Sequence, residues 1–220
     1  MRNHKKFPYL LALVAFALAA LIATGCGSSN HDGHTATPKA NAVDRAFVRS
    51  MVPHHHSAVQ MAKMALEAGR HRQVKDLAAS IVSTQTAEIA QLSGIAKSVG
   101  AETGDSSGGM SGMSHGEHMS GDAGDLNTLG LSQEEAGMSM RMSMPGKAKD
   151  FDRVFIDAMV MHHAGAIRMA RAELARGQNP ELKTLAKSII TAQTKEIEEM
   201  NSWRVDWYGA ATPTSIVPAP

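Results

Sequence analysis

The chain has 220 residues, of which 43% are hydrophobic, and its formal net charge is +1 at pH 7. That length fits one ordinary globular domain, and the near-neutral charge is not typical of a nucleic-acid-binding protein. Methionine and histidine stand out instead, with 15 and 11 residues beside a single cysteine.

Residues 1–26, MRNHKKFPYLLALVAFALAALIATGC, are organised like an export signal. A basic start precedes an apolar stretch and small residues, which is typical of a signal peptide rather than a membrane-spanning helix. The last residues, ATGC, resemble the bacterial lipobox, in which Cys26 is lipidated as the first residue of the mature chain. We therefore expect an exported lipoprotein, anchored to the outer face of the cytoplasmic membrane or held in the periplasm or at the cell surface. Cleavage with release is the alternative.

Lipidation of Cys26 would use the only thiol of the chain. The exported domain would then have no disulfide and no free cysteine, so that any soft metal ligand must be a methionine thioether. Residues 27–42, which are rich in Ser, Gly and Asn, follow as a flexible tether that is too polar to pack.

The first helical hairpin is expected over residues 43–99, and its first helix contains three consecutive histidines within an apolar pattern, MVPHHHSAVQMAKMAL. Asn41 or Asp44 can cap the start of this helix. Gly69 ends it, and Pro53 should kink it. Four side chains with imidazole or thioether groups fall on its apolar face: Met51, His54, His55 and Met61.

The second helix of this hairpin, from about residue 72 to residue 99, has an apolar stripe interrupted by two polar side chains, Gln85 and Glu88. A carboxylate or amide that faces a core is costly unless it is hydrogen-bonded, paired or bound to a metal. We therefore expect Gln85 and Glu88 to face the histidines, as alternative ligands or as hydrogen-bond partners of the ligands.

Residues 100–147 are expected to link two hairpins, and Gly, Ser and Asp keep residues 100–125 from packing. This segment contains five side chains that suit a soft metal: Met110, Met113, His115, His118 and Met119. We interpret it as a soft-metal binding segment, with incidental or oxidant-scavenging residues as the alternative. Ser132 and Glu135 form a capping box that predicts a short helix over 132–143. Some methionines of that helix would then pack against the protein and would not bind metal.

Residues 148–208 repeat the first hairpin at an offset of 108 positions without a gap, so that Asp152 corresponds to Asp44. The repeat supplies a second set of candidate residues: Met159, His162, His163 and Met169 on its first helix, and Gln193 and Glu196 on its second. Asn179 as N-cap and Pro180 at the first helical position begin that second helix. Residues 209–220 are expected to be a disordered tail.

Neither hairpin can bury its apolar stripe alone, so the two should close into an all-α four-helix bundle with a pseudo-twofold axis. The long linker permits pairing within one chain or exchange between two chains of a homodimer. Successive residues of a helix diverge by about 100°. We therefore expect one histidine of each adjacent pair to face the core and the other to lie at an interhelical edge.

The pattern FDRVFIDAMVMHHAGAIRMA followed by LAKSIITAQTKEIEEM closely resembles the bacterial DUF305 family, and the resemblance covers residues 44–207. It implies an exported, ferritin-like four-helix fold. The best understood members are periplasmic proteins of the CopM type, which bind copper and support copper resistance. Carried over to this sequence, the resemblance implies metal binding by Met51, His54, His55, Met61, Met159, His162, His163 and Met169. Pro53 and His56 depart from the family pattern.

The ligand types favour copper. Thioether with imidazole suits Cu(I), and imidazole with oxygen ligands suits Cu(II), while silver is a further candidate. We expect an exported protein that buffers, scavenges or carries copper at the cell surface. Its partners would be the metal ion, the membrane through Cys26, and an unknown protein that donates or accepts copper, with no nucleic acid.

Three other interpretations stay open. His54 and His162 can hydrogen-bond Glu88 and Glu196 as purely structural pairs. A ferritin-like di-metal redox protein with iron or manganese is the second, although its usual Glu-x-x-His motif is absent from the sequence. The third is a metal-free structural or partner-binding bundle. The sequence contains no catalytic triad spacing, phosphate loop or catalytic thiol, so we do not expect an enzyme.

Overall fold

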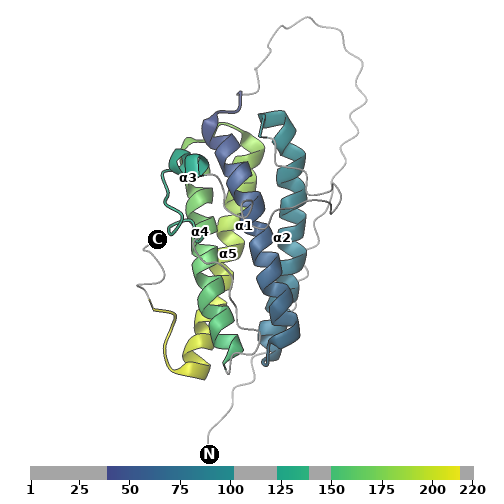
Figure 1. Ribbon diagram of the computed structural model, residues 1–220, viewed down its shortest axis with the longest axis vertical. Helices are drawn as coiled ribbons and strands as arrows, with labels where there is room; N and C mark the ends of the chain where they lie inside the picture. Colours follow the sequence, from purple (N-terminus) through teal and green to yellow (C-terminus); the bar gives the residue numbers. More distant parts are fainter. Residues whose placement is uncertain (1–38, 102–122, 139–149, 214–220) are drawn as a thin grey trace, which may run out of the picture. The chain divides into compact units, whose positions relative to one another are not determined.

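The computed structural model describes residues 39–101, 123–138 and 150–213, and these residues form helices and turns without a strand (Figure 1). The helices are α1 (Ala42–Ala68), α2 (Arg72–Val99), α3 (Ala123–Leu129), α4 (Phe151–Arg176) and α5 (Pro180–Tyr208). The prediction of an all-helical fold is confirmed. None of the helices in the described ranges is long and apolar enough to cross a membrane.

The ends of the long helices follow from local sequence. Asn41 is the N-cap of α1, because its side chain accepts the backbone N–H groups of Val43 and Asp44 while the Asp44 carboxylate accepts that of Asn41. Asn179 is the N-cap of α5, because its side chain accepts the backbone N–H groups of Glu181 and Leu182, and Pro180 follows at the first helical position. Helix α1 continues through Pro53 and ends at Gly69.

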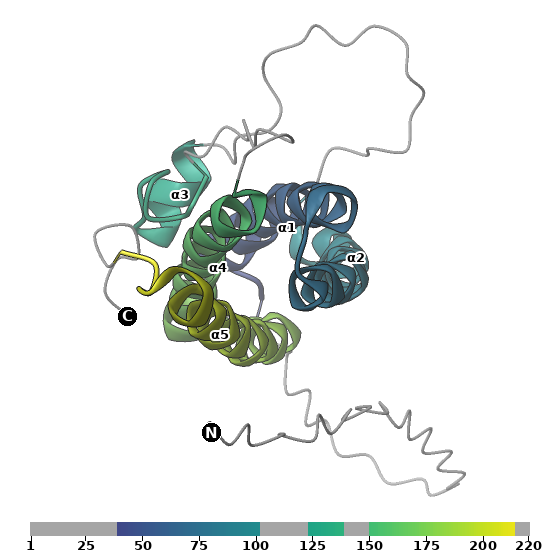
Figure 2. The same ribbon diagram turned by 90° about the horizontal axis from the view of Figure 1, so that it is seen from below.

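The four long helices form a bundle of two hairpins, α1 with α2 and α4 with α5, which meet mainly through α1 and α4 (Figure 2). Helices α1 and α4 run antiparallel, since the start of each lies beside the loop that follows the other. Together with the repeat, this arrangement gives the bundle its pseudo-twofold symmetry, as predicted. Every candidate residue on α1 therefore has an equivalent on α4 related by the same axis.

Two buried aspartates join the hairpins at opposite ends of the α1 and α4 pair. Asp44 accepts the backbone N–H groups of Gln178 and Asn179 at 2.9 and 2.8 Å. Asp152 accepts those of Arg70 and His71 at 2.9 and 2.8 Å. The two contacts are equivalent under the 108-residue offset, so each hairpin loop is held by a carboxylate from the first helix of the other hairpin.

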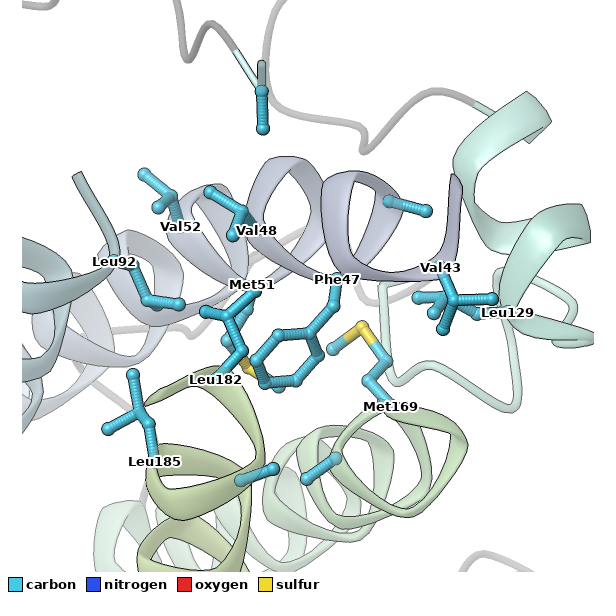
Figure 3. Packing of buried hydrophobic residues seen from close by; sticks show 14 of the residues in the cluster. Val43, Phe47, Val48, Met51, Val52, Leu92, Leu129, Met169, Leu182 and Leu185 are labelled. Atoms are coloured by element: carbon cyan, nitrogen blue, oxygen red, sulfur yellow. The ribbon is translucent and has the colours of Figure 1, made fainter. Parts of the chain in front are cut away.

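The hydrophobic core consists of two clusters. One contains Met51 and Met169 with Phe47 and Leu182 (Figure 3). The other contains Met61 and Met159 with residues of all four long helices. Along α1 the histidine residues lie between Met51 of the first cluster and Met61 of the second, so a polar layer separates the two apolar ones.

The segment between the hairpins differs from the prediction. Residues 123–129 form α3, which packs on α1 through the buried side chains of Leu126 and Leu129. Residues 132–138 form turns and a short connection instead of the expected helix, although the Ser132–Glu135 capping box is present. The expectation of an unpacked segment extending to residue 125 is wrong at its end, because Asp125 is buried there and pairs with Arg49.

Candidate metal centre

Four imidazole rings form a row across the middle of the bundle. The ring centroids of His54 and His162 are only 3.6 Å apart, with an interplanar angle of 34°. His55 lies 6.3 Å from His54, and His163 lies 6.4 Å from His162, measured between ring centroids. His54 and His162 are equivalent in the repeat, so the pseudo-twofold axis passes between them.

A glutamate lies at each end of this row. His163 Nε2 and Glu196 Oε2 are 2.6 Å apart and form a hydrogen bond. His55 Nε2 and Glu88 Oε2 are 2.8 Å apart, without the direction of a regular hydrogen bond. Both imidazole side chains are fully buried, whereas the glutamate side chains are about 15% exposed. The row therefore ends in two carboxylates that reach toward the surface.

The pairing of His and Glu differs from the sequence expectation in one respect. The expected partners of the glutamates were His54 and His162, but His55 and His163 make these contacts. All four rings are buried, and within each pair one histidine meets its repeat partner in the centre while the other faces a glutamate of the neighbouring helix. The reason is that α1 and α4 each pack against two neighbouring helices, which buries two adjacent helical positions at once.

Burial makes the central pair unusually weak bases. Loss of hydration lowers the pKa of both His54 and His162 well below the ordinary value of 6.5, and the neighbouring imidazoles lower it further. Both rings are therefore neutral near pH 7. A neutral imidazole has a nitrogen lone pair that can bind a metal, and no proton has to be removed first.

Several buried polar atoms of this layer have no hydrogen-bond partner. They include Nδ1 of His54, His55 and His163, both ring nitrogens of His162, and the side-chain amides of Gln85 and Gln193. Buried polar groups without a partner are rare and each requires an explanation such as a bound ion. Gln85 and Gln193 are buried, and their side-chain amides form no hydrogen bond, so their role beside the histidines stays a prediction.

The donor atoms are not gathered around one point. In residues 39–101, 123–138 and 150–213, no three side chains of His, Cys, Asp or Glu have the arrangement of a metal site. The four helical methionines are buried in the two apolar clusters on either side of the row. Metal binding would therefore require side chains of the layer to turn toward a shared ion.

The remaining candidate ligands lie outside the described residues. These are Met110, Met113, His115, His118 and Met119 of the linker, and the lipidation candidate Cys26. Their roles stay predictions. Met138, the first methionine of the MSMRMSM stretch, is described and packs against the apolar cluster of Met51.

A buried carboxyl pair was missed by sequence reasoning. Glu173 is fully buried on α4, and burial, followed by the side-chain interaction with Asp44 and then by the charge of Asp44, raises its pKa to about 8. Burial alone would raise the pKa of Asp44 too, but backbone hydrogen bonds from Asn179 and Asn41 lower it below the ordinary value. The repeat could have revealed this residue. Glu173 occupies the position of Ala65 in the first copy, so a carboxylate replaces a small apolar side chain there.

The helix arrangement and the buried imidazole layer define a ferritin-like four-helix protein with histidines in its core. The chain belongs to the DUF305 family, a domain of unknown function, whose family model matches residues 44–204. Among solved structures, CopM in its Cu(I)-bound form is 30% identical with a TM-score of 0.55. That alignment covers 76% of this chain and 98% of CopM.

Two further relatives extend the comparison. A DUF305 protein of Streptomyces coelicolor is 21% identical with a TM-score of 0.55, covering 78% of this chain and 96% of that protein, and shows the fold alone. The uncharacterized protein L153 of Acanthamoeba polyphaga mimivirus is 41% identical over 51 residues. That match spans 23% of this chain and 34% of the viral protein, so about a third of this curated relative is covered.

Proposed function

We propose that this chain is an exported copper-binding protein whose buried histidine layer holds the ion. The observation that carries the proposal is the set of imidazole nitrogens without partners in the layer of His54, His55, His162 and His163. Their rings lie in one continuous row. A purely structural layer would leave these atoms buried and unsatisfied, at a cost of about 1–3 kcal/mol each.

The acceptors beside the rings match the surroundings of metal-binding histidines. Such histidines usually donate one ring N–H to a carboxylate or carbonyl, which leaves the other nitrogen for the metal. Glu88 and Glu196 are placed to accept from Nε2 of His55 and His163, so Nδ1 would bind copper. We assign the glutamates this supporting role, rather than that of direct ligands.

The choice of copper rests on chemistry and on similarity. Neutral imidazoles suit both oxidation states of copper, and the buried thioethers on either side of the row suit Cu(I). CopM, the 30% identical neighbour, was solved with Cu(I), with Cu(II) and with silver. We extend copper binding to this chain, with silver as a second ion. The CopM structures give no support to iron or manganese.

We infer the location and the use of the metal from the composition of the leader and of the linker. The leader of residues 1–26 would export the chain, and lipidation of Cys26 would hold it at the membrane surface. The linker methionines and histidines would capture copper before the bundle binds it. The protein would then buffer or scavenge copper outside the cytoplasm and contribute to metal resistance.

An anaerobic Cu(I) competition titration tests the proposal on the chain from residue 27 onward. We compare it with a variant in which His54, His55, His162 and His163 are changed to Gln, and with a deletion of residues 105–122. His56→Gln is the matched control, because His56 is adjacent but only half-buried. Circular dichroism checks that each variant is folded.

Loss of tight binding in the four-histidine variant, but not in His56→Gln, is the expected result. Loss only on deletion of residues 105–122 would move the site to the linker. Absence of competitive binding by the unchanged chain would reject copper. Iron and manganese binding would then be measured before the chain is treated as a metal-free scaffold.

A further inference from the structure

The turn that follows α3 makes the two central histidines unequal. His54 Nε2 lies 3.0 Å from the backbone carbonyl oxygen of Ala136, in hydrogen-bond geometry. Neither ring nitrogen of its repeat partner His162 has a hydrogen bond of regular geometry, although the backbone of His54 acts on that ring and raises its pKa slightly against the larger effect of burial. The four long helices obey the pseudo-twofold axis, but residues 130–138 occur only once in the chain. Their backbone lies against His162 at Gly137, yet their hydrogen bond to an imidazole ring goes to His54.

The turn reaches His54 because α4 has a glycine where the turn crosses it. A Cβ atom at Gly165 would lie 2.1 Å from the Ala136 carbonyl oxygen, which is far inside van der Waals contact. Gly137 has a φ of 68°, and a Cβ there would lie 3.1 Å from the Met161 carbonyl oxygen. The backbone of the turn therefore lies directly on α4, and any side chain at residue 165 would displace it.

Contacts within the turn hold the Ala136 carbonyl in this position. Ser132 and Glu135 form the reciprocal capping box, and the Ala136 N–H donates to the Ser132 carbonyl at 3.0 Å. Arg168 of α4 donates to the Glu135 carbonyl at 2.8 Å. The carbonyl that faces His54 thus belongs to a turn fixed both internally and to the helix that contains His162.

The hydrogen bond determines which nitrogen of His54 is protonated. A carbonyl oxygen only accepts hydrogen bonds, so Nε2 must be the nitrogen that has the proton. Nδ1 of His54 is buried and has no partner. A proton on Nδ1 as well would create an unsatisfied buried donor and a buried charge, both of which are unfavourable. The lone pair of His54 is therefore on Nδ1 before any metal arrives.

We propose that Ala136 is a positioning residue, whose carbonyl fixes His54 as an Nδ1 ligand while His162 stays able to bind a metal through either nitrogen. The inference rests on the proposed function for its metal, but the fixed tautomer is a property of the metal-free protein. The same chemistry is present at His163, where Glu196 takes the place of the carbonyl. At His55 the Glu88 carboxylate lies 2.8 Å from Nε2 without the direction of a regular hydrogen bond. His54 and His163 would thus present Nδ1.

The test displaces the turn without changing any histidine. Gly165→Ala puts a methyl group where the Ala136 carbonyl lies, and Ser57→Ala is the matched control at the equivalent position of the first repeat. Ser132→Ala is a milder second variant, which removes the capping box and leaves α4 unchanged. Two-bond ¹⁵N–¹H correlation spectra of the metal-free protein report the His54 tautomer in each chain.

We expect the Nε2–H tautomer of His54 in the unchanged chain and in Ser57→Ala, and a mixture of tautomers in Gly165→Ala. Titration with Ag(I), a diamagnetic substitute for Cu(I), should shift the Nδ1 resonance of His54 and leave its Nε2 proton in place. Cu(I) affinity should fall by roughly 10- to 100-fold in Gly165→Ala, the usual effect of losing such a partner. Ser132→Ala should show a smaller loss in the same direction.

An Nδ1–H tautomer in the unchanged chain, or an Ag(I)-induced shift at Nε2, would overturn the inference even if copper binds tightly. Unchanged Cu(I) affinity in a folded Gly165→Ala protein whose tautomer has changed would overturn it as well. Failure of the unchanged chain to bind Ag(I) and Cu(I) would instead reject the proposed function, while the tautomer measurement would still decide the role of Ala136 in the metal-free protein.

Discussion

At the scale of single residues, the polar layer of the bundle has very different environments for chemically similar groups. His54 and His162 lie close together, neutral and nearly inaccessible, whereas the glutamates at the ends of the row reach the surface. Glu173, away from the row, is enclosed completely. Burial penalises the charged form of an ionisable group, so His54, His162 and Glu173 each have a predictable response to pH.

Glu173 makes the stability of the fold depend on pH. Its folded pKa of about 8 lies above the ordinary value of 4.5, so the folded state binds more protons than the unfolded state between these values. The contribution of Glu173 to stability is therefore fully present below about pH 4.5 and is lost as the pH rises through 8. Glu173→Gln removes this dependence, since an amide does not titrate.

Urea unfolding of the unchanged chain and of Glu173→Gln at pH 5, 7 and 9 measures this effect. The difference in unfolding free energy should favour the variant increasingly from pH 5 to pH 9. Comparison of the two proteins is necessary, because the neutral burial of His54 and His162 acts in the opposite direction, weakening the fold as the pH falls below 6.5. A difference that is constant with pH would show that Glu173 ionises normally.

The buried methionines allow packing and ligation to be separated. Met51 and Met169 lie in one apolar cluster, and leucine has a similar volume without sulfur (Figure 3). Met51→Leu and Met169→Leu should each change stability by less than about 1.5 kcal/mol. If the thioethers bind Cu(I), the double variant should lose Cu(I) affinity while remaining folded, as thermal unfolding would show. Equal Cu(I) affinity in the competition titration would assign these side chains to packing alone.

At the scale of elements, the hairpins are joined by the paired aspartates at the ends of α1 and α4. Asp152 is 1% exposed and also contacts His71 Nδ1 at 2.6 Å. Its removal would leave the N–H groups of Arg70 and His71 without their acceptor. Hydrogen bonds to a charged group contribute about 1.5–3 kcal/mol each, so this contact stabilises the loop between α1 and α2 strongly.

Asp152→Ala should therefore lower the free energy of unfolding by about 2–4 kcal/mol, within the range expected for loss of a buried charged acceptor. Asp206→Ala is the control, because Asp206 is exposed near the end of α5 and should change stability by less than about 0.5 kcal/mol. Chemical denaturation of both variants measures the difference. Equal stabilities would show that solvent replaces the Asp152 contact without cost.

The sequence predicts some elements of the fold better than others. The repeat and the caps predicted the long helices, because capping and apolar periodicity are local properties of the sequence. The position of residues 130–138 was not predictable, because it depends on the absence of a side chain at Gly165 on a distant helix. The Ser132–Glu135 capping box is present as expected, but Gly137, two residues further on, has a positive φ, so the chain does not continue as a helix.

The sequence predicted which residue types form the histidine layer, but it did not predict which of these side chains contact one another. The two copies identified the adjacent histidines and the glutamates that face them. Which histidine meets which glutamate depends on how far α1 rotates against α2 and α4, and rotation by one residue changes the direction of a side chain by about 100°. The structure places Glu88 beside His55 and leaves His54 in contact with the His162 ring.

At the scale of the whole bundle, the imidazole layer is built by both hairpins together. His54 and His55 come from one repeat, and His162 and His163 come from the other. The interface between α1 and α4 therefore determines whether the four rings meet. Copper bound in this layer would link the repeats, and the linker of residues 102–122 would supply ligands of a different kind, mainly thioethers.

X-ray absorption at the copper K-edge tests this central claim most directly, because imidazole and thioether ligands scatter differently. The measurement uses the chain from residue 27 onward, loaded with one equivalent of Cu(I) under anaerobic conditions. We predict imidazole scattering from at least two histidines, and its loss in the variant lacking His54, His55, His162 and His163. A spectrum that contains only sulfur neighbours, and is unchanged in that variant, would contradict a copper site in the histidine layer.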